Sequence, residues 1–167
     1  MRSFARWRTS KKLARPATGG HSDWENNVED ELIPLGWKHD PSEGFIALIG
    51  GIWSSGTGKY GFISRSEHGN RNGVVHGGMM MSFADRILGM SARAASGAIR
   101  GATISFSCQF MAPLKLGRFA MMEPRVERLT KSMAFMTGSL VCDDEVILSA
   151  QGVWRISTSA TNPKVDA

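Results

Sequence analysis

Residues 103–110, TISFSCQF, show the clearest pattern along the chain, a strict alternation of polar and apolar side chains. Ile104, Phe106, Cys108 and Phe110 fall on one face of an extended segment, and the polar residues fall on the other. A period of two residues is typical of a β-strand with one buried face. We therefore predict a strand here that covers an apolar core.

Three later segments also favour strands, and they complete a predicted set of four antiparallel strands: residues 118–129, 132–142 and 145–157. The last two are joined by Asp143 and Asp144, which predict a tight hairpin turn.

Residues 77–95, GGMMMSFADRILGMSARAA, predict a helix of four to five turns. The segment is apolar on nearly every face, which is typical of a helix buried inside a domain. A sheet wrapped around one central helix is the simplest fold that buries such an element.

The N-terminal half predicts a short helix and a hairpin. Residues 21–37 favour the helix, with a capping box of Ser22 and Glu25 and a stop at Pro34. Its apolar face would consist of Trp24, Val28 and Leu32. Residues 44–55 and 58–66 then read as two strands joined around Gly56 and Gly58.

The length of 167 residues predicts one domain, over residues 21–160, between a basic arm at 1–20 and a tail at 161–167. Of the 20 basic residues, six precede the first acid, so the rest of the chain has 14 basic and 15 acidic residues. A nearly neutral body argues against a nucleic-acid groove. The arm reads as a solvated extension in a cytoplasmic protein, with an organellar transit peptide as the alternative.

Several classes of site and location are not favoured. No apolar run approaches the roughly 20 residues of a membrane span. Cys108 and Cys142 lie in apolar patterns and read as buried, inert thiols. His68 and His76 lack a third ligand nearby, so we expect no metal site.

Gly77 and Gly78 open the predicted central helix. The first N–H groups of a helix have no partner within the helix and lie at its positive end, so they can stabilise an oxyanion. A residue without Cβ also lets a substrate carbonyl approach the backbone. The alternative is that both glycines only ease a tight turn.

Asp85 lies eight residues after Gly77, about 12 Å along a helix. In an apolar helix a carboxylate is costly unless it is used or paired. The alternatives are an ion pair with Arg86 or Arg93, or an exposed position. Because one helix cannot readily offer both its N-terminus and Asp85 to one carbonyl, the spacing predicts a site shared by two antiparallel copies, and so a homo-oligomer.

The stretch HGNRNGVVHGG, followed by AD, resembles the H-x-N-x-x-G-x-x-H-G-G…D signature of hotdog-fold acyl-CoA thioesterases, in particular the phenylacetate-pathway branch. The resemblance covers roughly residues 43–157. It implies an α+β hotdog fold, an antiparallel sheet wrapped around one long central helix. It also implies a thioester hydrolase that acts as a homodimer or homotetramer, with sites at the subunit interface.

The resemblance assigns roles to individual residues. Asp85 would be the general base or nucleophile, Asn70 would orient the water, and Gly77 N–H would be the oxyanion donor. His76 precedes the glycines, and Thr103 stands where some relatives have a serine. By strand parity Thr103 points away from the Ile104 and Phe106 face, so it would have to reach the site at a strand end or across an interface.

The substrate implied by the resemblance is an acyl-CoA, and no separate cofactor is expected because CoA is part of the substrate. Gly78 would contact the substrate, and Lys131 and Arg128 would lie near its phosphates. The alternative is that both charges simply belong to a solvated hairpin.

Two other functions use the same fold. An enoyl-thioester hydratase would resemble D-x-x-x-x-H on the central helix, but the fifth residue after Asp85 is Met90. A non-catalytic acyl-CoA sensor is the second alternative, and the presence of both Asn70 and Asp85 favours an enzyme over it.

Overall fold

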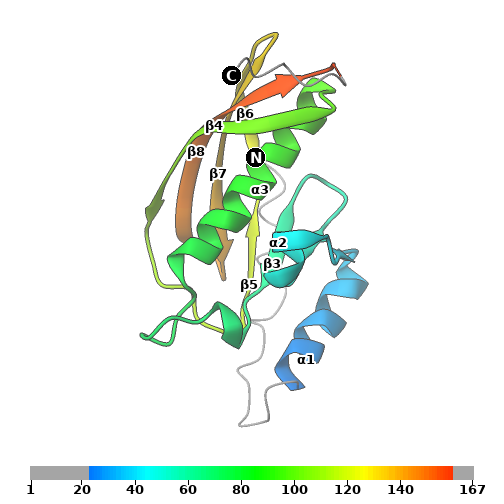
Figure 1. Cartoon of the computed structure of the whole chain (residues 1–167). Helices are drawn as coiled ribbons and strands as arrows, with labels where there is room; N and C mark the ends of the chain where they lie inside the picture. Colours follow the sequence, from blue (N-terminus) through cyan, green and yellow to red (C-terminus); the bar gives the residue numbers. More distant parts are fainter. Residues whose placement is uncertain (1–22, 160–167) are drawn as a thin grey trace.

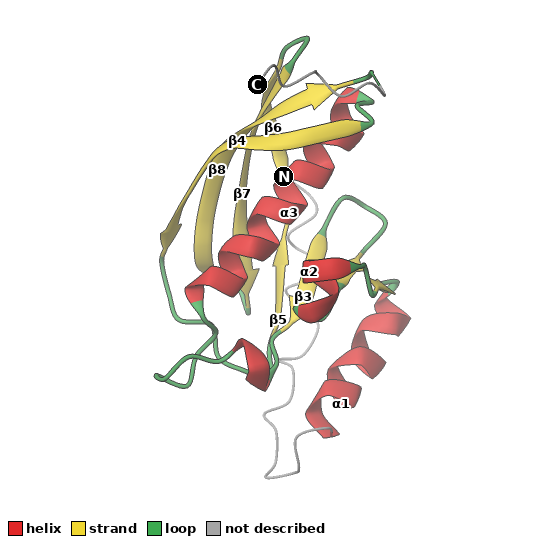
Figure 2. Ribbon diagram, in the orientation of Figure 1, coloured by secondary structure: helices red, strands yellow, loops and turns green. Residues whose placement is uncertain are grey.

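The computed structural model describes residues 23–159. One antiparallel sheet of eight strands curves around a long helix, α3 (Figures 1 and 2). In chain order the elements are α1 (Asp23–Leu32), η2 (Ile33–Leu35), β1 (Lys38–Asp40), α2 (Gly44–Leu48), β2 (Ile52–Ser54), β3 (Tyr60–Ile63), η3 (Ser66–His68), α3 (Gly77–Ser96), β4 (Arg100–Phe110), β5 (Phe119–Met122), β6 (Arg125–Leu129), β7 (Met133–Cys142) and β8 (Glu145–Ser157). The strand order is β1-β2-β3-β5-β7-β8-β4, and β6 pairs with β7.

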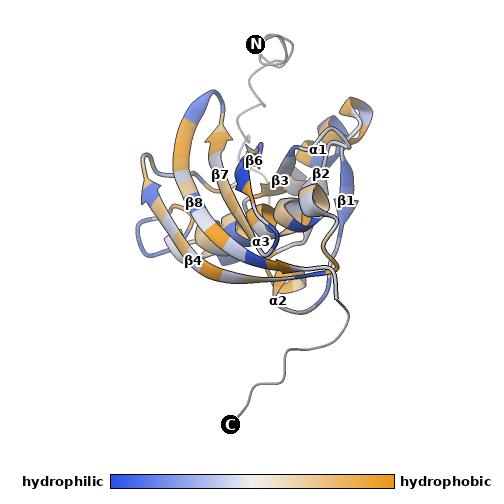
Figure 3. Ribbon diagram, turned by 90° about the horizontal axis from the view of Figure 1, so that it is seen from above, coloured by the Kyte–Doolittle hydropathy of each residue, from blue (hydrophilic) through white to orange (hydrophobic). Residues whose placement is uncertain are grey.

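The predicted central helix is confirmed as α3, and the sheet covers one side of it. Its buried side chains form the centre of the main core: Met79, Met80, Phe83, Ala84, Ile87, Leu88 and Ala92. The other side is open in the single chain, because Gly78 is exposed, Asp85 is half-buried and Met81 is 39% exposed. The expectation of a helix buried on every face is therefore wrong for one chain. Figure 3 shows the arc of β7, β8 and β4 curving around α3.

A second apolar cluster lies on the other face of the sheet. The predicted N-terminal helix is confirmed as α1, whose Val28 and Leu32 are buried there with Trp53 and Ile63. In β2 and β3 the neighbouring residues Ile52 and Phe62 belong instead to the main core, as strand alternation requires. The side chains of Ser22, Trp24 and Glu25, including the predicted capping box, lie outside the described part of the chain.

The prediction of one strand over residues 44–55 is wrong in its first half. Residues Gly44–Leu48 form the short helix α2, and only Ile52–Ser54 form a strand. Between them Gly50 and Gly51 have φ values of 87° and 74°, which few other residues adopt. This left-handed pair turns the chain, so the apolar run cannot continue as one extended segment.

The single strand predicted over residues 118–129 is two strands, β5 and β6. The break falls at Pro124, which has no N–H to donate to a sheet. β5 pairs with β3 and β7, whereas β6 pairs with β7 alone. The predicted hairpin between β7 and β8 is confirmed, and its Asp143 and Asp144 both have positive φ, at 49° and 69°.

Strand β4 contains a β-bulge that changes which face its residues share. Thr103 pairs with Trp154 and Ser105 pairs with Val153, so Ile104 is the extra residue. Ile104 is 58% exposed, and the expectation that it shares the face of Phe106 is wrong. The bulge brings Thr103 to the α3 side of the strand.

The two thiols are free, as predicted. Cys142 is buried and Cys108 is half-buried. Burial raises the pKa of Cys142 to about 11, so its thiol stays protonated near neutral pH. Within residues 23–159, no helix is both long and apolar enough to cross a membrane.

The turn before β2 gives a first test of the fold. An added Cβ at Gly51 would lie 2.4 Å from the Asp40 carbonyl oxygen, whereas at Gly56, with a similar φ of 72°, it would meet nothing within 4 Å. We expect Gly51→Ala to lower the free energy of unfolding by several kcal/mol and Gly56→Ala to lower it by about 1 kcal/mol. Urea titration of both variants isolates the steric clash. Equal losses would show that only the positive φ matters.

Candidate active site

The loop that leads into α3 is held by backbone hydrogen bonds from two directions. Val75 N–H donates to the Leu114 carbonyl at 2.8 Å, and His76 N–H donates to the His68 carbonyl at 2.7 Å. An isolated bridge joins Val74 to Lys115. The start of the helix is therefore fixed against both η3 and the segment that follows β4.

Asn70 organises this loop. Its Oδ1 accepts from Asn72 N–H at 2.8 Å, and its backbone carbonyl accepts from Gly73 N–H at 3.0 Å. The Asn70 side-chain NH₂ group has no hydrogen-bond acceptor within residues 23–159, so it can donate to a water or a ligand.

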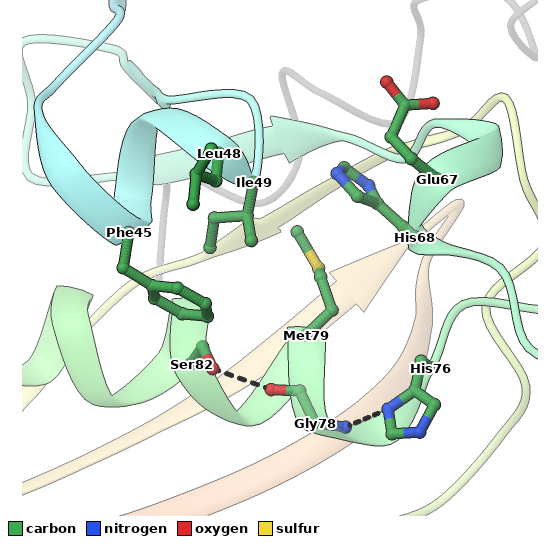
Figure 4. Close-up of a pocket in the computed structure, with 9 residues that line it drawn as sticks. All are labelled: Phe45, Leu48, Ile49, Glu67, His68, His76, Gly78, Met79 and Ser82. Atoms are coloured by element: carbon green, nitrogen blue, oxygen red, sulfur yellow. Dashed lines mark hydrogen bonds between the residues drawn. The ribbon is translucent and has the colours of Figure 1, made fainter.

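His76 caps α3 and decides which glycine N–H is free. Its Nδ1 accepts from Gly78 N–H at 2.9 Å, so the neutral ring carries its proton on Nε2 (Figure 4). Gly77 N–H has no acceptor in the described part of the chain. One unpartnered N–H thus remains at the positive end of a 20-residue helix.

Both glycines also have a close side-chain neighbour. A Cβ at Gly77 would lie 2.9 Å from Cζ of Phe110, the last residue of β4. A Cβ at Gly78 would lie 3.1 Å from Nδ1 of His76. The turn and the oxyanion donor are therefore compatible roles for this pair, and the contact with Phe110 had no signal in the local sequence.

Asp85 accepts a hydrogen bond from Thr103 Oγ1 at 2.8 Å. The bulge at Ile104 makes this contact possible within one chain, so Thr103 needs no strand end or interface to reach Asp85. Within residues 23–159 Asp85 forms no ion pair with Arg86 or Arg93. The carboxylate is thus oriented by a neutral hydroxyl.

A polar pocket of about 160 Å³ lies beside Asp85. Arg86, Arg93, Thr103 and Trp154 are among the residues that line it. The two arginines form no ion pair in the described chain and outnumber the one carboxylate of the pocket, Asp85, so the lining has one net positive charge.

The predicted site residues form two groups. Asn70, His76 and Gly77 lie at the start of α3, whereas Asp85 and Thr103 lie about 12 Å along it. One chain does not bring the oxyanion donor and the carboxylate together.

The two basic residues predicted near phosphates lie toward the other end of α3. Lys131, in the turn between β6 and β7, lines a pocket of about 300 Å³ with Ala95 and Ser96. Arg128 is exposed on β6.

His68 is buried next to the loop, with 5% of its surface exposed. Its Nδ1 accepts from Arg65 N–H at 3.0 Å, and burial lowers its pKa, so the ring is neutral near neutral pH. In this arrangement His68 and His76 each use one ring nitrogen to brace the backbone.

A pocket of about 200 Å³ lies between α2 and the start of α3 (Figure 4). Its apolar walls come from Phe45, Leu48 and Ile49 of the α2 segment and from Met79 of α3. Sequence reasoning missed this pocket because it treated residues 44–55 as a strand.

The middle of the chain matches a known family. Residues 72–149, a little under half of the chain, match the family model of the Thioesterase superfamily. A Thermoplasma volcanium protein named Putative esterase TV1331 is 36% identical over 78 residues, or 47% of this chain. The chain spans 57% of the length of that relative.

Solved structures show a similar fold over most of the chain. Zebrafish Thioesterase Superfamily Member 2 has a TM-score of 0.61 at 22% identity, with 79% of this chain and 97% of that chain covered. A conserved Pseudomonas aeruginosa protein has a TM-score of 0.60 at 16% identity, with 69% and 94% covered. The chain has the hotdog fold. This confirms the fold class predicted from the sequence.

The buried His68 makes stability depend on pH. Its folded pKa lies below the ordinary value of 6.5, so the unfolded chain binds more protons once the pH falls below that value. We expect the melting temperature to fall as the pH drops from about 7.5 to about 5.5, and to fall less in His68→Gln. Thermal melts of both proteins across this range measure the difference. Parallel curves would show that other groups control the effect.

Proposed function

We propose that this protein is an acyl-CoA thioesterase, which hydrolyses a thioester to a free acid and CoA. The observation that carries the proposal is an unpartnered N–H at Gly77 together with a hydroxyl-oriented carboxylate at Asp85. The match to the Thioesterase superfamily supports it. A Streptococcus mutans protein of similar fold was solved bound to acetyl CoA, with a TM-score of 0.55 at 16% identity and with 59% of this chain and 79% of that chain covered.

The proposed site needs two copies of the chain. Gly77 and Asp85 lie at equal distances from Met81, four residues on either side. A twofold axis at Met81 between antiparallel copies of α3 would therefore place Gly77 of each copy level with the Asp85 of the other. The open face of α3 supports this pairing, as does β4, a long edge strand with no partner on its outer side within residues 23–159.

In this arrangement the thioester carbonyl accepts a hydrogen bond from Gly77 N–H of one copy. Asp85 of the other copy takes a proton from a water whose oxygen adds to the carbonyl carbon, or its own oxygen adds directly. In the direct route, loss of the thiolate leaves an acyl–Asp85 anhydride, which a water then hydrolyses to the free acid and the regenerated carboxylate. Asn70 donates to the water, and Thr103 holds the carboxylate. The tetrahedral intermediate then expels the CoA thiolate, which needs little acid assistance because thiols ionise near pH 8.5.

We also propose that the protein belongs to the phenylacetate-pathway branch of these thioesterases and that it acts in the cytoplasm. A non-catalytic acyl-CoA sensor with the same fold would bind an acyl-CoA without hydrolysing it. Release of free thiol from an acyl-CoA, followed with a thiol-reactive dye, distinguishes the enzyme from the sensor.

Asp85→Asn tests the carboxylate. It keeps the size of the side chain and removes the base, so we expect kcat to fall by at least about 100-fold, while the melting temperature stays close to that of the wild type. Asp30→Asn, at an exposed position of α1, is the matched control and should keep full activity. A fully active Asp85→Asn enzyme would rule out the mechanism.

Met81→Glu tests the two-copy site. It would place two like charges at the proposed twofold axis, so we expect light scattering to show a smaller oligomer and turnover to fall with it. Met133→Glu is the control, because Met133 is 40% exposed and Met81 is 39% exposed, but Met133 lies on β7 away from the axis. An active wild-type monomer would contradict the shared site.

A further inference from the structure

We infer that the acyl group of the substrate binds in the pocket between α2 and the start of α3, and that this pocket favours apolar acyl groups of about six to eight carbons. The inference rests on the proposed thioester hydrolysis and adds the substrate class.

The pocket begins where the reacting carbonyl would lie. Gly78 and His76, which follow and precede the free Gly77 N–H, both line it. A carbonyl that accepts from Gly77 therefore has its first acyl carbons at the mouth of this pocket. Figure 4 shows Phe45 of α2 above Ser82, on the α3 side of the space.

Two large apolar side chains of α2 are exposed to solvent. Phe45 is 59% exposed and Leu48 is 79% exposed, although both line the pocket. Adjacent exposed apolar side chains in a hollow are typical of a binding site for an apolar ligand.

The α2 segment is held as a fixed wall. Gly51 N–H donates to the Ile46 carbonyl at 3.0 Å, and Gly50 N–H donates to the Ala47 carbonyl at 3.0 Å. His39 Nε2 is 3.0 Å from the Gly50 carbonyl oxygen, which ties the end of the segment to β1.

The charges around the two pockets separate the two ends of the substrate. The α2 pocket is lined by no lysine or arginine, and Glu67 at its edge is acidic and would repel phosphates. The other pocket is lined by Arg86 and Arg93 together with Asp85, so its lining has one net positive charge. The phosphate-bearing leaving group is thus directed toward the arginines and the acyl group toward α2.

The volume sets the size of the acyl group. The pocket holds about 200 Å³, whereas a protein cavity of roughly 150 Å³ accommodates benzene. Each buried methylene should raise kcat/KM about fourfold until the pocket is full. We therefore expect kcat/KM to increase with chain length from acetyl-CoA and to stop increasing near hexanoyl- to octanoyl-CoA.

Substitutions of opposite size at Phe45 test the wall. We expect the ratio of kcat/KM for dodecanoyl-CoA to that for hexanoyl-CoA to increase at least about fourfold in Phe45→Ala and to decrease at least about fourfold in Phe45→Trp, since one methylene contact is worth roughly fourfold. Leu35→Ala is the control: Leu35 is 58% exposed and does not line the pocket. An unchanged ratio in both Phe45 variants would overturn the inference.

A binding measurement separates this inference from the proposed reaction. Calorimetry on the Asp85→Asn protein should show tighter binding of hexanoyl-CoA than of acetyl-CoA, with the difference reduced by Phe45→Trp. If the wild type hydrolyses no acyl-CoA but this difference is present, the proposed reaction fails and the pocket assignment stands. If acyl-CoAs are hydrolysed and the two affinities are equal, the reaction stands and the pocket assignment fails.

Discussion

The rotation of α3 about its own axis is the constraint on which the site depends. Phe83, Ile87 and Leu88 are fully buried against the sheet, and burial of each contributes about 1.5–3 kcal/mol. A turn of the helix by one residue would expose part of this stripe. The Thr103–Asp85 hydrogen bond contributes only about 1.5–3 kcal/mol, as bonds to charged groups do, so it cannot set the rotation. Core packing places Asp85 at the border of the sheet, and the site is built around that position.

The free N–H of Gly77 is a second consequence of how α3 begins. His76 Nδ1 accepts from the Gly78 N–H, and a Cβ at position 77 would lie 2.9 Å from the ring of Phe110. Because His76 caps Gly78 and not Gly77, the Gly77 N–H has no acceptor in the described part of the chain. The hydrogen bond from Gly78 N–H to His76, which caps the helix, therefore also leaves the proposed oxyanion donor free.

Sequence patterns predicted the long elements because α3 is a long run of strong helix formers and β4 alternates with a period of two residues. They failed where a single residue changes the geometry. The alternation in residues 103–110 continues without a break, yet the bulge at Ile104 reverses the face of Thr103. The Gly50–Gly51 turn and Pro124 divide segments whose apolar content is continuous. The contact of Phe110 with Gly77 joins residues far apart in sequence, so no local pattern could reveal it.

The open face of α3 links assembly to chemistry in the proposed enzyme. Contacts away from a twofold axis occur twice, and Met81 at the axis would be supplied by both copies, so one substitution there changes both sides of the interface. The same axis would complete two sites at once, because each copy supplies Gly77 to one site and Asp85 to the other. Each site would then draw its acyl pocket from the copy that supplies Gly77 and its arginines from the copy that supplies Asp85. The two ends of one substrate would therefore be recognised by different chains, and a change at either surface would alter binding and assembly together.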